Sequence, residues 1–313
     1  MALTGGGGCR QKLRGESNLI EPPKTFDSFW SELRAEVDSV DCDWDRTERS
    51  QIVTSRGHSW KIDWIRYSSV EDHLIQGWLA VPYDHQANGA GFLWMPGYSY
   101  GTPRPDDSDL VEGTVTCAIN VHGNTPYEAY VNPAGKNDYI LNGIDDPRTY
   151  IYRVIVAHCL CAVGVLLNQP EISGGIASAG MSQGGGLALI VSSQSALTGI
   201  CCADMPFLAD LRTALTLSHS PAYRTLKRYI DEHPKCLDTV LLFDSLFHAG
   251  NIHVPTWLSA GGKDPACKPV TVEAVYAQLA SKNKHYEYFP NAGHIFMPQM
   301  NAAYREMVDD YLV

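Results

Sequence analysis

The chain has 313 residues, of which 44% are hydrophobic and 19% charged, as is ordinary for a globular protein with a sizeable core. Its formal net charge of −11 argues against a nucleic-acid partner, because phosphate binding needs a basic surface. The glycine-rich start, residues 1–10, lacks the apolar segment of a secretory signal, and we treat residues 1–19 as a flexible tail.

The first elements expected after the tail are a helix and a group of strands. Pro22 and Pro23 precede apolar residues at helical spacing, namely Phe26, Phe29, Trp30, Leu33 and Val37. The stretch Ser50–Tyr83 is rich in β-formers with partial alternation, and a second arm covers Leu74–Val81. This pattern predicts antiparallel strands at one edge of a sheet.

From residue 91 onward, short apolar strands alternate with helical patterns. The predicted strands are Gly91–Met95, Val115–Val121, Gly175–Met181, Gly199–Met205, Thr256–Gly261 and His285–Pro290. The predicted helices are Pro147–Leu167, Gln183–Ser195 and Val272–Ala280. Such alternation predicts a mostly parallel sheet with helices on both faces.

Two segments differ from the rest of this pattern. Tyr150–Leu167 is the most apolar stretch, but it contains Arg153 and His158 and is too short for a comfortable membrane span, so we expect a buried helix. Phe207–Pro234 interrupts the alternation with two or three short helices, which we expect to lie over the ligand-binding edge of the sheet. No repeat or linker divides residues 20–313, and we predict one domain there.

The pentapeptide Gly180-Met181-Ser182-Gln183-Gly184 is a Gly-x-Ser-x-Gly motif in an informative context. A predicted strand runs directly into it and a predicted helix runs directly out. This strand–turn–helix is the nucleophile elbow of α/β-hydrolases, in which a strained turn exposes the serine hydroxyl. The alternative is a glycine-rich turn without chemistry. The context favours Ser182 as a nucleophile and an α/β-hydrolase fold.

An activated serine needs an acid and a histidine that follow it in that order, each in a loop after a later strand. Asp264 follows the predicted strand Thr256–Gly261, and this position favours a catalytic role over the alternative of a helix cap or turn former before Pro265. His294 follows the predicted strand His285–Pro290. We therefore predict a Ser182–His294–Asp264 triad.

Acyl transfer through a serine also needs two N–H donors for the oxyanion. One is expected from Gln183, the residue after the nucleophile. The second is expected from Tyr98, in the loop Pro96-Gly97-Tyr98, whose ring would also contact substrate. The residues alone leave an ordinary β-turn as an equal alternative for this loop.

The nine cysteines give no sign of a metal centre or a disulfide framework. Their number is odd, no Cys-x-x-Cys pair occurs, and most lie in apolar runs, among them Cys159, Cys161, Cys201 and Cys202. We expect reduced thiols in a cytoplasmic protein, with no metal and no cofactor.

The motifs resemble those of the acetyl xylan esterase/cephalosporin-C deacetylase family, carbohydrate esterase family 7. Residues 180–185 match its Gly-x-Ser-Gln-Gly-Gly motif, and Gly97-Tyr98 stands where the family places its oxyanion-hole tyrosine. Further similar segments are Phe26–Trp30, Asp146–Arg153, Ala203–Leu211 and Phe243–Asp264, with Cys267 following as a cysteine does there.

The resemblance implies a metal-independent deacetylase for short acyl esters of sugars, xylo-oligosaccharides or cephalosporins. It also implies a ring-shaped homohexamer. Three positions depart from the family pattern. His122-Gly123-Asn124 replaces Arg-Gly-Gln, His294-Ile295 replaces His-Glu, and His158 stands where the family usually has aspartate.

The sequence leaves other functions open. A general short-chain carboxylesterase would use the same triad, whereas a non-catalytic binding or scaffold protein on a hydrolase fold would account for the altered motifs. A prolyl-type peptidase is disfavoured, because the repeats of a propeller domain are missing from the sequence. We expect a small-molecule ester substrate and neither nucleic-acid nor membrane partners.

Overall fold

The computed structural model describes residues 21–107, 110–122, 126–131 and 138–313. The predicted tail, residues 1–19, lies outside these ranges, as do Gly123 and Asn124 of the altered motif.

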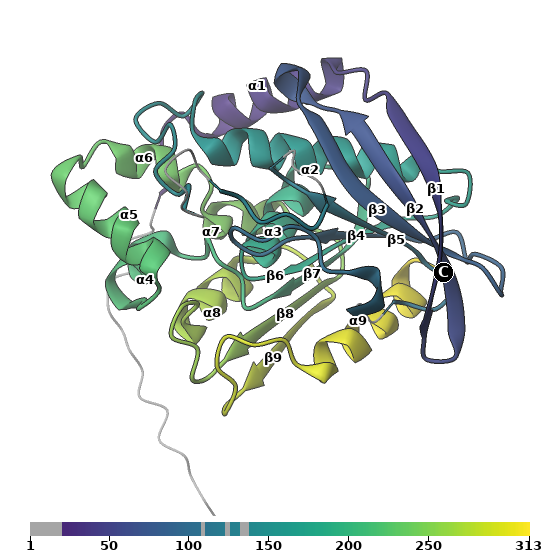
Figure 1. Ribbon diagram of the computed structural model, residues 1–313. Helices are drawn as coiled ribbons and strands as arrows, with labels where there is room; N and C mark the ends of the chain where they lie inside the picture. The colour runs from purple at the N-terminus through teal and green to yellow at the C-terminus, as the bar shows by residue number, and fades with distance from the viewer. Residues whose placement is uncertain (1–20, 108–109, 123–125, 132–137) are drawn as a thin grey trace, which may run out of the picture.

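Nine strands of the described chain form one sheet in the order β1-β2-β3-β5-β4-β6-β7-β8-β9 (Figure 1). Their bounds are β1 Trp44–Ser55, β2 His58–Ser68, β3 Leu74–Pro82, β4 Gly91–Met95, β5 Val115–Asn120, β6 Ile176–Met181, β7 Thr198–Asp204, β8 Thr256–Gly261 and β9 Lys284–Phe289. The pairs β1–β2, β2–β3 and β3–β5 are antiparallel, whereas all pairs from β5 to β9 are parallel. This confirms the predicted mostly parallel sheet with antiparallel N-terminal strands.

The strands from β4 onward agree with the prediction to within one residue at each end. The exception in the sheet is β1, which begins at Trp44 rather than at Ser50. β1 is an edge strand with only one neighbour, and its side chains are mostly partly or fully exposed. The apolar alternation that marks a half-buried strand is therefore missing from its sequence.

The helices lie between and after the strands. Their bounds are α1 Phe26–Ser39, α2 Ile151–Leu167, α3 Gln183–Gln194, α4 Leu211–Leu217, α5 Pro221–Glu232, α6 Cys236–Leu241, α7 Ser245–His248, α8 Pro269–Gln278 and α9 Pro298–Tyr311. Helix α2 begins four residues later than predicted, because Tyr150 has an extended backbone that caps it. The predicted insertion is longer than expected, since short helices continue through α6 and α7.

Helices cover both faces of the sheet, with α1 and α2 on one side and α9 on the other (Figure 1). Strand β4 shows both contacts. A Cβ atom added at Gly91 would lie 3.2 Å from the Leu166 side chain of α2. The neighbouring Phe92 ring instead lies 5.5 Å from the Tyr304 ring of α9. Alternate residues of a strand point to opposite faces, so one strand packs against both layers.

Helix α2 is buried in this arrangement, as its apolar sequence predicts, with Ile155, Val156 and Cys159 fully covered. No helix in the described residues is both long and apolar enough to cross a membrane.

Candidate active site

Ser182 occupies the sharp turn between β6 and α3. Its backbone has φ +60° and ψ −121°, which is unfavourable for a residue with a side chain. Hydrogen bonds hold this conformation: the Ser182 N–H donates to the Asp204 oxygen at 2.9 Å, and the Ser182 oxygen accepts from the N–H groups of Gly186 and Phe207. The backbone therefore has the geometry of a nucleophile elbow.

The glycines of the motif are required by close backbone contacts. A Cβ atom at Gly184 would lie 2.1 Å from the backbone oxygen of Met95, and one at Gly180 would lie 2.5 Å from the carbonyl carbon of Gly184. These distances are far below van der Waals contact. The strand and the helix can approach this closely only because neither position carries a side chain.

Asp264 and His294 are joined by a hydrogen bond of 2.6 Å between Oδ2 and Nδ1. The other carboxylate oxygen of Asp264 accepts from the N–H groups of Ala266 at 2.7 Å and Cys267 at 2.9 Å. The Asp264 side chain is fully buried, whereas 26% of the His294 side chain is exposed. The carboxylate therefore fixes the orientation of a ring that is still accessible from solvent.

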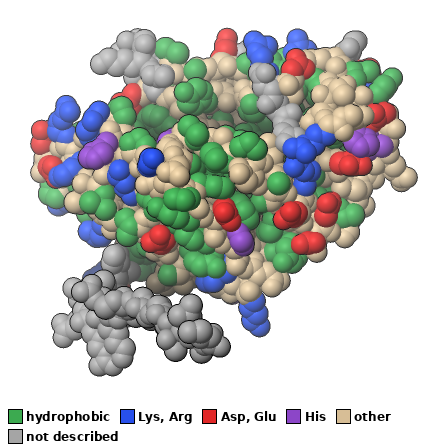
Figure 2. Space-filling view, turned by 90° about the horizontal axis from the view of Figure 1, so that it is seen from below, with side chains coloured by type: hydrophobic (Ala, Val, Ile, Leu, Met, Phe, Trp, Pro, Cys, Tyr) green, Lys and Arg blue, Asp and Glu red, His purple; other side chains and the backbone are tan. Residues whose placement is uncertain are grey.

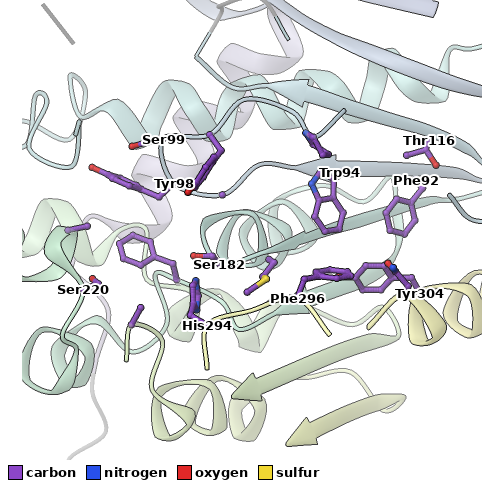
Figure 3. A pocket seen from close by; sticks show the side chains of 18 of the residues that line it. Phe92, Trp94, Tyr98, Ser99, Thr116, Ser182, Ser220, His294, Phe296 and Tyr304 are labelled. Carbon is purple, nitrogen blue, oxygen red and sulfur yellow. The ribbon is translucent and has the colours of Figure 1, made fainter. Parts of the chain in front are cut away.

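Ser182 and His294 lie side by side in the wall of one cavity of about 1200 Å³ (Figure 3). The structure thus brings all three predicted triad residues together, Asp264 through its bond to His294. This arrangement allows Nε2 of His294 to take the proton of an attacking serine hydroxyl.

The two residues predicted to donate to the oxyanion are Gln183, next to Ser182 in the chain, and Tyr98, which lines the same cavity. Gln183 is the first residue of α3, and Tyr98 follows β4. Neither backbone N–H donates a hydrogen bond to another residue of the described chain. The N–H of Gln183, at the start of α3, is suited to stabilise a developing negative charge.

Side chains that the sequence did not single out hold both donor residues in place. The Gln183 side-chain oxygen accepts hydrogen bonds from the hydroxyls of Tyr139 at 2.6 Å and Tyr152 at 2.9 Å. The Tyr98 hydroxyl donates to Asp138 at 2.5 Å and accepts from the N–H of Tyr139 at 2.9 Å. No periodicity or motif marks these partners, because they become neighbours only in the folded chain.

The Tyr98 ring forms a fixed wall of the cavity. It lies 4.3 Å from the ring of Tyr139, centroid to centroid, and burial raises the pKa of its hydroxyl. The phenol therefore stays protonated and its hydroxyl stays bound to the loop around Asp138. Only the ring face and the backbone N–H can serve a substrate.

Three described residues depart from the family pattern, namely His122, His158 and Ile295. Of these, only Ile295 is next to a triad residue in the chain. His122 has no hydrogen-bond partner for its ring nitrogens in the described chain and packs between Tyr130 and Tyr139. Burial lowers the pKa of His122 to about 4 and that of His158 to about 4, so both are neutral at pH 7. Ile295, next to His294, is exposed.

Two groups in the described residues bring potential metal ligands within 4.8 Å of one another, namely Asp264, Cys267 and His294, and His58, Asp84 and His85. In the first group, hydrogen bonding accounts for the proximity of Asp264 and His294. In the second, His85 bonds to Asp84 at 2.5 Å and accepts from the Gly113 N–H at 3.1 Å, so both of its ring nitrogens are engaged.

Comparison with known proteins identifies the family. Residues 11–309 match the acetyl xylan esterase (AXE1) family. The chain is 24% identical over 286 residues to acetyl esterase Axe7A of Xylanibacter ruminicola, covering 85% of this chain and 63% of that protein. The chain thus spans less than two thirds of the length of this curated relative.

Solved structures agree on the fold. Acetyl xylan esterase from Paenibacillus sp. R4 has a TM-score of 0.80 at 24% identity, covering 93% of this chain and 95% of that one. Acetyl xylan esterase 1 from Thermoanaerobacterium sp. JW/SL YS485 has a TM-score of 0.80 at 24% identity, covering 92% and 94%. These similarities establish an α/β-hydrolase fold. With the match over nearly its whole length, the chain belongs to the acetyl xylan esterase family.

Proposed function

We propose that this protein is a serine esterase that hydrolyses acetyl esters of small molecules. The observation that carries the proposal is the 2.6 Å hydrogen bond between Asp264 and His294 beside the strained turn that presents Ser182. A buried acid, an accessible imidazole and a serine that lines the cavity are the parts that acyl transfer requires.

In the proposed mechanism, Nε2 of His294 removes the hydroxyl proton of Ser182 as its oxygen attacks the ester carbonyl. The N–H groups of Gln183 and Tyr98 stabilise the oxyanion. Collapse of the tetrahedral intermediate breaks the carbon–oxygen bond, and His294 protonates the departing alcohol. Water then attacks the acetyl-serine with His294 as base, and acetate is released. Asp264 holds the required tautomer and stabilises the imidazolium.

The first test combines mutation with chemical labelling. Ser182→Ala should abolish hydrolysis of p-nitrophenyl acetate and labelling by a fluorophosphonate probe, while circular dichroism stays unchanged. Ser195→Ala, at the other end of α3, is the matched control and should keep both. Labelling of the unaltered protein would also end the scaffold hypothesis, since only an activated serine reacts. Full activity in Ser182→Ala would refute the proposal.

Sugars, xylo-oligosaccharides and cephalosporin-type molecules are the proposed sources of the acetyl group. The similarity to acetyl xylan esterases supports the first two. Turnover of acetylated xylo-oligosaccharides and cephalosporin C, followed by acetate release, tests each source separately.

A general short-chain carboxylesterase is the second candidate, because the cavity is far larger than an acetyl group. Comparison of acetyl, butyryl and hexanoyl esters of one alcohol separates the two functions. Preference for the longer acyl chains would replace the acetylesterase by the carboxylesterase.

We also propose that the protein forms a homo-oligomer, a hexamer as in the family that the sequence resembles. We propose further that it functions in a reducing compartment such as the cytoplasm. Hydrophobic side chains gather over the centre of the face in Figure 2, which supports association. The eight cysteines of the described chain form no disulfide, which supports the compartment. Light scattering after gel filtration tests the assembly, and cell fractionation tests the location.

A further inference from the structure

The active-site cavity extends to both sides of Ser182 (Figure 3). On one side, Tyr98, Ser99 and Ser220 line it. On the other side, an arm extends past Trp94 and Phe296 to Phe92 and Tyr304. We call it the aromatic arm and define it by these four rings together with Thr116 at its far end.

The rings of the aromatic arm support one another. The Trp94 ring lies 5.9 Å from that of Phe296 and 6.1 Å from that of Tyr304, and Phe92 lies 5.5 Å from Tyr304. They come from β4, from α9 and from the loop that carries His294. The walls are therefore fixed by the sheet and its covering helix, so the arm exists without a ligand.

The aromatic arm offers few polar side-chain atoms to a ligand. The Tyr304 hydroxyl donates to Asp204, and Nε1 of Trp78, which also lines the cavity, donates to the Pro103 oxygen at 2.9 Å. Thr116 has a buried hydroxyl with no partner in the described chain. A sugar ring placed here would lose hydrogen bonds to water for several hydroxyls and regain few, which is unfavourable. A hydrocarbon group has no hydrogen bonds to water to lose, so its binding here is not penalised in this way.

The cavity volume of about 1200 Å³ exceeds by far what an acetyl group can occupy. If the acyl group is acetyl, most of the substrate inside the cavity must be the alcohol part. We propose that the aromatic arm binds an apolar, aromatic group of the alcohol, so that acetates of arylalkyl alcohols are a substrate class of this enzyme. This inference rests on the proposed esterase function.

The test uses acetates of unactivated primary alcohols, so that the leaving-group chemistry stays constant. Ethyl, 2-phenylethyl and 3-phenylpropyl acetate would be compared by pH-stat titration. We expect kcat/KM for 2-phenylethyl acetate to exceed that for ethyl acetate about 30-fold, the factor expected for burying one phenyl group.

Two variants link the preference to the arm. Phe296→Ala should lower the ratio of kcat/KM for 2-phenylethyl acetate to kcat/KM for ethyl acetate about tenfold, because it removes one wall of the arm. The Phe296 side chain is 38% exposed, so the fold should tolerate the change. Thr116→Leu should fill the far end and discriminate against 3-phenylpropyl acetate. Tyr311→Ala, an exposed aromatic on α9 outside the cavity, is the matched control and should leave the ratios unchanged.

The outcomes are distinct. Equal kcat/KM for the three acetates, or ratios that both arm variants leave unchanged, overturns the inference while the esterase function stands. A preference that follows acyl length instead of the alcohol assigns the arm to the acyl group and also overturns it. Loss of all ester hydrolysis only in Ser182→Ala, with the predicted ratios, supports both proposals. Absence of hydrolysis of every ester by the unaltered protein refutes the esterase function itself, and with it the inference.

Discussion

The hydroxyl of Tyr304 on α9 donates a hydrogen bond to the buried carboxylate of Asp204 at the end of β7. The same carboxylate accepts from Trp257 Nε1 at 3.0 Å and Ser259 Oγ at 2.5 Å. The backbone oxygen of Asp204 accepts the N–H of Ser182. One residue therefore links the wall of the aromatic arm to the nucleophile turn.

Replacing Tyr304 by phenylalanine should destabilise the protein in a pH-dependent way. Burial raises the pKa of Asp204 to about 6. Because the pKa of Asp204 is higher in the folded than in the unfolded protein, its contribution to stability is complete below its ordinary pKa and is lost as pH rises through about 6. Tyr304→Phe removes a donor to the ionised carboxylate, so it should lower the unfolding free energy by about 1–3 kcal/mol at pH 8 and by less at pH 5. Urea unfolding at both pH values measures this, with Tyr311→Phe as control. A larger loss at pH 5 than at pH 8 would contradict the assignment.

Asp264→Asn should reduce kcat for p-nitrophenyl acetate by roughly 10⁴-fold with little change in structure. The reason is that the asparagine oxygen would take the place of Oδ1, which accepts the N–H groups of Ala266 and Cys267, so its NH2 group would face His294. This group would donate to Nδ1 and leave the ring proton on Nε2, which then cannot take the proton of Ser182. Steady-state kinetics and circular dichroism measure the effect. Asp244→Asn, another buried acid outside the cavity, should keep its activity. Equal losses in both variants would point to a structural role for Asp264.

Gly184→Ala should abolish activity or prevent folding, because the new Cβ would lie 2.1 Å from the backbone oxygen of Met95. Strand β4 would have to move, and with it the loop that carries Tyr98. The matched control is Gly164→Ala in the last turn of α2, where a Cβ meets nothing within 4 Å. Alanine there should raise stability by roughly 0.5–1 kcal/mol. Yield of soluble protein and thermal melting compare the two; a normal Gly184→Ala enzyme would show that the contact is not required.

The protein should lose stability in acid partly through His122. Its pKa is lowered by burial to about 4, so its contribution is present above the ordinary histidine value and is lost as pH falls through about 4. Between pH 6.5 and 4 this amounts to on the order of 3 kcal/mol. His122→Phe should therefore flatten the decline of the unfolding free energy with falling pH. The exposed His253, changed to phenylalanine, serves as control and should leave the slope as it is. An unchanged slope in His122→Phe would exclude this contribution.

The sequence by itself determined the central features of the fold and the candidates for the triad. Strong apolar runs located β4 to β8 almost to the residue, and aromatic residues marked the edge strand β9. The elbow motif together with chain order selected Ser182, Asp264 and His294. These signals are local, because buried strands must be apolar and a tight turn must have glycine. The sequence did not locate the first residue of the polar edge strand β1 or of α2, which begins at Ile151, because the surroundings of these residues impose no such pattern.

Only the tertiary structure decided how the site is supported and what it can admit. Asp138, Tyr139 and Tyr152 hold the two predicted oxyanion donors through hydrogen bonds between residues 31 to 44 positions apart in the chain. The aromatic arm joins rings from β4, from α9 and from the loop after His294. Hydrogen bonds and packing between such distant segments leave no period or spacing in the sequence, because they depend on how layers of the fold meet rather than on neighbours along the chain.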